Sequence, residues 1–221
     1  MPDRPRQRVP FSDLATAAYC PRQLYYARRE ADRSVPERVA AVRELAFEYP
    51  ALVEAPDAAI RDRPVEVPAA EYRRRLRALR DEGWGSLVSP AERAVTVAGR
   101  DVVGRVDKVV TAPLRPSLVS PGHPPPEGVW EPQSVRAVAA AKALSYREGT
   151  TVDRAVVEYP AHGVVRTLSL TTRRKAAYRR ALRTVRDLDG PPPRLADDAK
   201  CAPCDYSADC GVQTRSLRSL L

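Results

Sequence analysis

Apolar and polar residues alternate most regularly in the middle of the chain, between residues 94 and 112. This stretch reads AVTVAGRDVVGRVDKVVTA and carries a Gly-Arg-Asp turn at its centre. A period of two places every second side chain on one face of a sheet, so the pattern predicts a β-hairpin. Further strands are predicted in LRPSLVS, which follows the hairpin, and on both sides of the turn in DRAVVEYPAHGVVRTLSL.

Helical spacing of apolar residues dominates the rest of the chain. A first helix is expected to open at Phe11 with Ser12 as its N-cap, and Pro21 directly after Cys20 must break or restart it. Helices are also predicted in LYYARRE, over 36–48, in EYRRRLRALRDEG up to Gly83, in the alanine-rich SVRAVAAAKALSYREG, and in TRRKAAYRRALRTVRDL with Thr172 as the cap. Residues 1–10 are expected to be a disordered lead-in, residues 48–68 a passage broken by prolines, and GPPPRLADDA an extended linker.

This order of elements predicts one domain over residues 1–221 with an α/β fold. We expect a mixed sheet of about five strands, flanked by helices, with residues 84–170 as the sheet core.

The charge balance favours an anionic partner. The chain has 37 basic residues, mostly arginine, against 28 acidic residues, for a net charge of +9. Arginine makes bidentate contacts with phosphate, although a GC-rich genome would give the same composition. No run of eighteen apolar residues occurs and residues 1–10 have no apolar core, so we expect a soluble, cytoplasmic protein without a membrane partner.

All four cysteines contribute to one pattern. Cys201, Cys204 and Cys210 form C-x2-C-x5-C, and Cys20 lies far upstream in AAYCPRQLYY. In a chain without a secretory signal this spacing is typical of a metal site rather than of disulfides. Four thiolates suit zinc or a 4Fe–4S cluster, and the single C-x2-C pair favours the cluster. Either group would join residues 11–35 to residues 196–215 as one metal-cluster region.

The ends of the chain resemble the CRISPR-associated RecB-type exonucleases, an iron–sulfur branch of the PD-(D/E)XK nuclease-like superfamily. The resemblance rests on FSDLATAAYCPRQLYY, on the terminal C-x2-C-x5-C, and on GRVDKVV with Gly104 and Asp107. It implies a PD-(D/E)XK nuclease-like fold, a 4Fe–4S cluster held by Cys20, Cys201, Cys204 and Cys210, and DNA as the partner. The implied process is CRISPR adaptation, together with the adaptation proteins, or DNA end processing.

The catalytic motifs of this family are mostly missing. Asp107 matches the metal-binding aspartate and Arg43 matches an arginine before it. The resemblance requires a His, a Glu, a Lys and a Gln at four further positions, which here hold Phe47, Leu118, Ser120 and Val138. One carboxylate binds a divalent cation weakly, because such cations need several oxygen ligands.

Three functions therefore stay open. The first is DNA binding by an iron–sulfur protein whose nuclease activity is weakened or lost, with Arg173, Arg174, Arg179 and Arg180 on the last long helix as candidate phosphate contacts. The second is an active exonuclease in which Asp107 and Glu131 hold Mg²⁺ or Mn²⁺, Glu131-Pro-Gln133 being a displaced Glu-x-Gln motif. The third is a zinc-stabilised interaction module. The alternative for Asp107 is an ion pair with Arg105 or Lys108, and His123 and His162 are expected to face solvent in loops.

Overall fold

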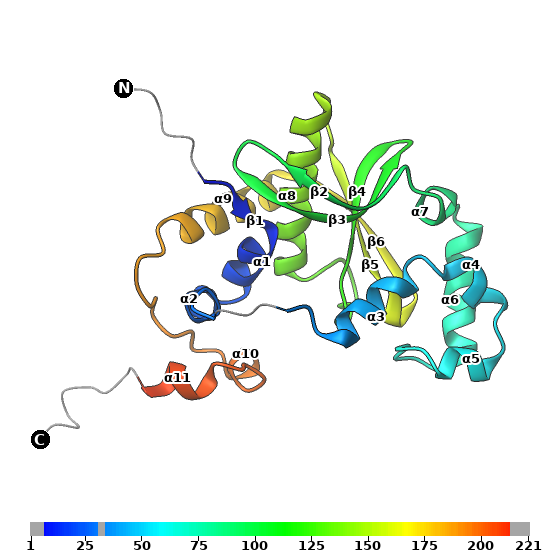
Figure 1. Cartoon of the computed structure of the whole chain (residues 1–221), viewed down its shortest axis with the longest axis horizontal. Coiled ribbons are helices and arrows are strands. Elements are labelled where there is room, and N and C mark those ends of the chain that lie inside the picture. The colour runs from blue at the N-terminus through cyan, green and yellow to red at the C-terminus, as the bar shows by residue number, and fades with distance from the viewer. Residues whose placement is uncertain (1–6, 31–33, 213–221) are drawn as a thin grey trace, which may run out of the picture.

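A computed structural model describes residues 7–30 and 34–212. Its centre is a mixed six-stranded sheet flanked by helices (Figure 1). Strand β3 carries β2 along one edge, while β1 and β4 pair with opposite ends of its other edge. β1 is parallel to β3 and β4 is parallel to β5, whereas the other pairs are antiparallel. The strands are β1 (Val9–Pro10), β2 (Glu92–Ala98), β3 (Val102–Thr111), β4 (Leu114–Val119), β5 (Arg154–Tyr159) and β6 (Val164–Ser169).

Two groups of helices flank the sheet, and two short helices carry the last cysteines (Figure 1). The first group is α1 (Phe11–Tyr19), α2 (Pro21–Ala27), α8 (Glu131–Glu148) and α9 (Thr172–Arg186). The second group is α3 (Glu37–Leu45), α4 (Tyr49–Glu54), α5 (Asp57–Arg61), α6 (Ala69–Asp81) and α7 (Gly85–Val88). A 3₁₀ turn, η1 (Pro160–His162), joins β5 to β6, and the chain continues to α10 (Asp198–Cys201) and α11 (Ser207–Val212).

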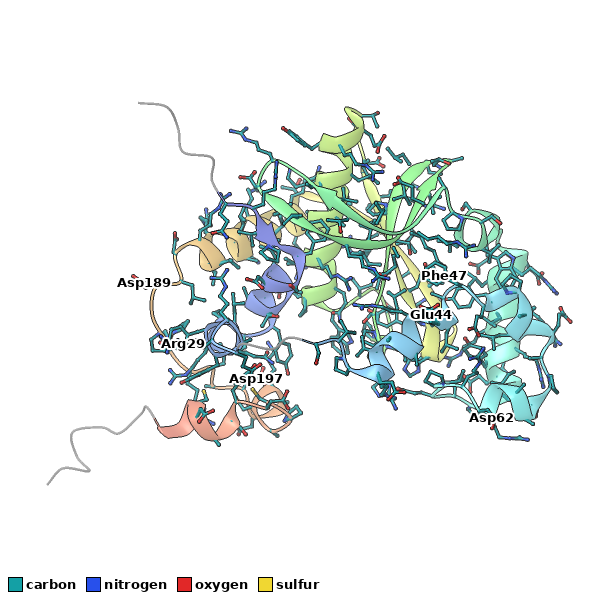
Figure 2. The ribbon with its side chains drawn as sticks, in the orientation of Figure 1. Arg29, Glu44, Phe47, Asp62, Asp189 and Asp197 are labelled. Carbon is teal, nitrogen blue, oxygen red and sulfur yellow. The ribbon has the colours of Figure 1, made fainter. Side chains whose placement is uncertain are left out.

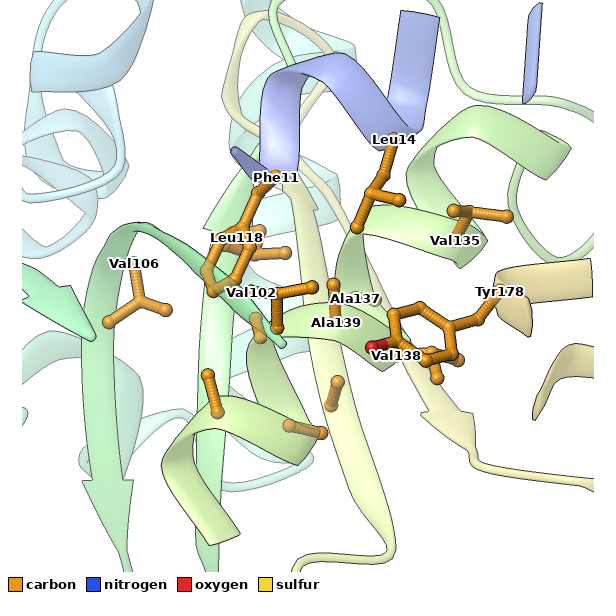
Figure 3. Packing of buried hydrophobic residues seen from close by; sticks show 14 of the residues in the cluster. Phe11, Leu14, Val102, Val106, Leu118, Val135, Ala137, Val138, Ala139 and Tyr178 are labelled. Carbon is orange, nitrogen blue, oxygen red and sulfur yellow. The ribbon is translucent and has the colours of Figure 1, made fainter. Parts of the chain in front are cut away.

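The main core lies between the sheet and helices α1, α8 and α9. Figure 3 shows Phe11 beside Val102 and Leu118, and Tyr178 of α9 beside Val138 of α8. The many alanines of α8 are fully buried, and such small side chains let other backbones approach the helix closely. Gly104 has the same role on β3, because a Cβ atom there would lie 2.3 Å from the Phe11 ring.

A second core lies under α3, α4 and α6, where Tyr49, Tyr72 and Trp84 are buried. The rings of Tyr49 and Trp84 stack with their centroids 6.2 Å apart. In Figure 1 α4, α5 and α6 lie at the opposite end of the molecule from α10 and α11. None of the helices in the described part of the chain is both long enough and apolar enough to cross a membrane.

The predicted α/β class, the hairpin and the long helices are confirmed. Three local predictions are wrong. Pro10, not Ser12, is the N-cap of α1, and Thr171, not Thr172, caps α9 by accepting from the backbone N–H of Arg174. The passage 48–68 is broken by prolines, as predicted, but it holds two short helices: Pro50 lies in the first turn of α4, and Pro56 is the N-cap of α5. Residues 9–10 form β1 rather than a disordered lead-in, and residues 1–6 lie outside the described range.

Candidate functional site

The four cysteines surround one cavity. Cys20 lies between α1 and α2, and Cys201, Cys204 and Cys210 come from α10, α11 and the turn between them. Together with Tyr19, Tyr26 and Tyr206 they line a small cavity of about 30 Å³, and all four thiols are free. The structure thus brings together the four residues that the sequence singled out. Residues 31–33 and 213–215 of the predicted cluster region lie outside the described residues.

Side chains of the segment after Cys20 hold the cysteine-bearing tail in place. The buried guanidinium of Arg22 donates hydrogen bonds to the carbonyl oxygens of Pro192, at 2.8 Å, and Cys210, at 3.3 Å. The hydroxyl of Tyr19 donates to the carbonyl of Lys200, and the ring of Tyr26 stacks on Tyr206. Figure 2 shows the labelled Asp197 in the tail, where it is the N-cap of α10. The aromatic and basic residues around Cys20 therefore have a structural role in docking the tail.

The spacing of the thiols bears on which group they could hold. Zn–S bonds of about 2.3 Å in a tetrahedron place the sulfur atoms about 3.8 Å apart. Yet no three of the four sulfur atoms, all of them in described residues, lie within 4.8 Å of one another. The backbone N–H of Gln23 points at the sulfur of Cys20 from 3.4 Å, as it would at a thiolate. Burial raises the pKa of Tyr19, and Cys204, Asp197, Cys20 and Cys201 raise it further, which reflects how close these groups are to its hydroxyl. Among the described residues, the four thiols are thus not clustered as a ligand set for one ion.

Asp107 lies where β3 separates from β4, and it is 99% buried. Its Oδ2 accepts a hydrogen bond of 2.7 Å from the backbone N–H of Val119. Two guanidinium groups face the same carboxylate: Nε of Arg43 lies 3.9 Å from Oδ1, and Nη2 of Arg136 lies 3.7 Å from Oδ2. Oδ1 has no hydrogen-bond partner within the described chain. The partners of Asp107 are therefore Arg43 and Arg136, and not Arg105 or Lys108 as the sequence suggested.

The side chains at the four substituted family positions add no ligand beside Asp107. Leu118 and Val138 belong to the main core. Phe47, which Figure 2 shows just beyond the end of α3, packs against the second core and lies under the side chain of Arg93. Ser120 is buried and its hydroxyl accepts a hydrogen bond from the side-chain amide of Gln133.

Glu131 lies in the first turn of α8, not on a strand. Its carboxylate is 60% exposed and lies 3.5 Å from Nη2 of Arg180. Its position on the surface contrasts with the burial of Asp107. Arg180 is thus both a predicted phosphate contact and the nearest described cation to Glu131.

The neighbouring Lys108 has a different partner from the one predicted. Its Nζ lies 2.9 Å from Glu158 and donates to the carbonyl of Ala46, and all of these atoms are buried. Ser117 donates to the other oxygen of Glu158. Burial lowers the pKa of Lys108, while the charge of Glu158 opposes the shift. Sequence reasoning missed this pair, since the period of two in each strand does not show that β4 brings β3 and β5 close together.

The basic helix α9 exposes part of its predicted surface. Arg173, Arg179 and Arg180 are exposed, whereas Arg174 is half-buried and donates to the carbonyl of Ser169. The opposite face of α9, with Tyr178 and Leu182, packs into the core.

The two histidines differ from the prediction and from each other. The side chain of His123 is 78% exposed, as expected for a loop residue. His162 is buried, so its predicted solvent exposure is wrong. It belongs to η1, and the core under α6 covers this turn: a Cβ atom at Gly163 would lie 3.2 Å from the ring of Tyr72.

Comparisons with known proteins complete the description. No family model and no curated protein matches this chain. Among solved structures, one titled "Crystal structure of SSO0001" is similar over 96% of this chain and 88% of its own, with a TM-score of 0.43 and 14% identity. The chain is therefore described by its fold class, a mixed α/β sheet flanked by helices, and by the residues of its own sites.

Proposed function

We propose that this chain is a DNA-binding iron–sulfur protein on a PD-(D/E)XK nuclease-like scaffold that has lost its nuclease activity. The observation that carries the proposal is that all four cysteines, from opposite ends of the sequence, line one cavity. A 4Fe–4S cluster held by Cys20, Cys201, Cys204 and Cys210 explains why the sulfur atoms are spaced more widely than a zinc ion requires. When bound, such a cluster cross-links the two ends of the chain and can transfer an electron.

The protein's own residues prepare this cavity. The backbone N–H of Gln23 donates to the sulfur of Cys20, the N-cap of α2, and Arg22 fixes the position of the last cysteine through its carbonyl. Tyr19, Tyr26 and Tyr206 also line the cavity, and the four cysteines are half-buried.

The surroundings of Asp107 support the loss of nuclease activity. Hydrolysis of a phosphodiester by metal ions needs clustered carboxylates around a divalent cation. Here a single carboxylate lies between Arg43 and Arg136, whose positive charges repel such a cation. The alternative, an active exonuclease that uses Asp107 and Glu131 with Mg²⁺ or Mn²⁺, requires the exposed Glu131 to leave Arg180.

The proposed partner is DNA, and the process, by resemblance, is CRISPR adaptation or DNA end processing. The exposed arginines of α9 support a phosphate-binding surface, because its other face is fixed in the core. The order of a β-hairpin with Asp107, a further strand, a long helix and a parallel strand supports the nuclease-like scaffold.

The test is the iron content of Cys20→Ala. We expect the wild-type chain, purified without oxygen, to be brown, to absorb near 400 nm and to contain about four iron atoms. Cys20→Ala should lose most of this iron. Ser207→Ala is the matched control, because Ser207 lines the same cavity without being a ligand, and it should keep the iron. A colourless wild-type protein whose zinc is lost in Cys20→Ala would instead support the zinc-stabilised interaction module.

A further inference from the structure

Glu66, His123 and His162 form a second cluster of potential ligand atoms, separate from the cysteines and from Asp107. Nε2 of His162 lies 3.2 Å from Oε2 of Glu66, and Nε2 of His123 lies 3.4 Å from the same oxygen. The two imidazole rings are 4.7 Å apart between centroids. We propose that these three residues bind one divalent transition-metal ion of the zinc class.

The distances fit such an ion. Bonds of about 2.0–2.1 Å to nitrogen and oxygen in a tetrahedron place two ligand atoms about 3.3–3.4 Å apart. The two measured distances, 3.2 and 3.4 Å, are close to this value, and the three ligand atoms all lie within 4.8 Å of one another. Two histidines and one glutamate are also a ligand set that zinc uses in proteins.

Nε2 of the buried His162 has the carboxylate of Glu66 as its neighbour but makes no well-aligned hydrogen bond to the described residues. The side chain of His162 is 7% exposed, and its Nε2 atom is close to Glu66 without the alignment of a hydrogen bond. A buried polar atom without a hydrogen bond costs free energy, so its presence in a stable core calls for an explanation. A metal ion between His162 and Glu66 would satisfy this nitrogen.

Glu66 supplies the one carboxylate of the cluster, and two arginines lie nearby. Burial lowers the pKa of His162 more than Glu66 raises it, and His123 and Arg75 lower it further. Arg75 is itself paired with Glu71, and Arg38 contacts only Oε1 of Glu66, which leaves Oε2 to the histidines.

Backbone contacts hold the three ligands in place. The N–H of Glu66 donates to the carbonyl of Ala161 at 2.8 Å, Arg75 donates to the carbonyl of His162, and the indole of Trp130 donates to the carbonyl of His123. The ligands come from the segment before α6, the proline-rich loop after β4, and η1. An ion here would fasten that loop to the body of the protein. Because His123 lies at the surface, a water molecule would occupy the fourth coordination position.

Zinc binding to the full-length chain tests this inference, which does not depend on the proposed function. Zn²⁺ is titrated by calorimetry into the wild-type chain, His123→Ala and Glu66→Gln. Glu127→Ala is the matched control, since Glu127 is an exposed acidic residue of the same loop outside the cluster. The cysteines are identical in all four proteins, so any zinc that they bind cancels in the comparison.

We expect the wild type and Glu127→Ala to bind one more equivalent of zinc than the other two variants, or to bind it at least tenfold more tightly. His123→Ala should stay folded because the side chain is exposed. The proposal is overturned if all four proteins bind zinc with the same stoichiometry and affinity, or if the wild type binds none outside the cysteine cavity.

Discussion

The groups around Asp107 determine what its carboxylate can bind. Its carboxylate is held by the N–H of Val119 and faces Arg43 and Arg136. Its hydrogen bond to the N–H of Val119 takes the place of a backbone hydrogen bond at the point where β3 and β4 separate. Its role in the structure is thus that of an internal counter-ion for two arginines.

We therefore predict no metal-dependent cleavage of single- or double-stranded DNA by the wild-type chain. The loss of several grouped catalytic residues typically removes many orders of magnitude in rate. The assay uses a labelled oligonucleotide with Mg²⁺ or Mn²⁺, beside Asp107→Ala. Cleavage by the wild type that disappears in Asp107→Ala would show an active centre and would make Glu131 the leading candidate for its second ligand.

Buried tyrosines should determine how stability changes at alkaline pH. Burial raises the pKa of Tyr159 and of Tyr178 to about 12, against about 10 in the unfolded chain. A folded-state pKa above the unfolded value stabilises the fold below pH 10, and this contribution is lost as the pH rises from about 10 to about 12.

Tyr159→Phe should weaken this alkaline dependence. It should cost little stability at pH 7, since the Tyr159 hydroxyl is buried without a hydrogen-bond partner among the described residues. Urea unfolding of both proteins between pH 7 and 11.5 measures the effect. Tyr146→Phe, at an exposed position, is the control and should follow the wild type.

At the scale of elements, the contact between α1 and β3 depends on Gly104. A Cβ atom there would lie 2.3 Å from Cδ2 and 2.9 Å from Cβ of Phe11, so the start of α1 would have to move. We expect Gly104→Ala to destabilise the protein by about 1–3 kcal/mol, as overpacked cores do. Gly122→Ala is the control, because nothing lies within 4 Å of its added atom. Equal denaturant midpoints for the two variants would contradict this account.

Helix α9 is the element on which the proposed DNA contact rests. Reversing the charge of Arg173 and Arg179 should weaken DNA binding at least tenfold at 100 mM salt, without changing any preference for sequence. The slope of log K against log salt should become shallower by about 2, one unit for each lost phosphate contact.

The control for this helix replaces Arg61 of α5 by Glu. This arginine is exposed, and α5 lies at the far end of the molecule from α9 (Figure 1). If the affinity of the wild-type chain for DNA does not depend on salt, the exposed arginines of α9 do not contact phosphates and α9 is a solvated surface helix.

At the scale of the whole molecule, the region around Cys20 joins the two ends of the described chain. Arg22 is central to this closure because it binds carbonyl oxygens at both Pro192 and Cys210. We expect Arg22→Ala to lower the iron content and to make residues after Gly190 sensitive to protease. It should also lower the free energy of unfolding by about 2 kcal/mol. Arg29→Ala, which removes an arginine that lies over the ring of Tyr25, should do neither.

The sequence alone determined the elements whose signal is local. The alternation in 94–112 predicts β2 and β3, and the alanine-rich and arginine-rich repeats predict α8 and α9, because side-chain periodicity depends only on the neighbouring residues. The spacing of the cysteines likewise singled out four residues that do line one cavity. The caps at Pro10 and Thr171 were missed by one or two residues, since several polar residues compete for such positions.

Only the tertiary structure decided which charged residues meet. Asp107 faces Arg43 and Arg136, Lys108 is paired with Glu158, and Glu66 lies between His123 and His162. Each of these contacts joins residues that are tens of positions apart. The free energy of such a contact depends on burial, which the order of residues in the sequence does not give.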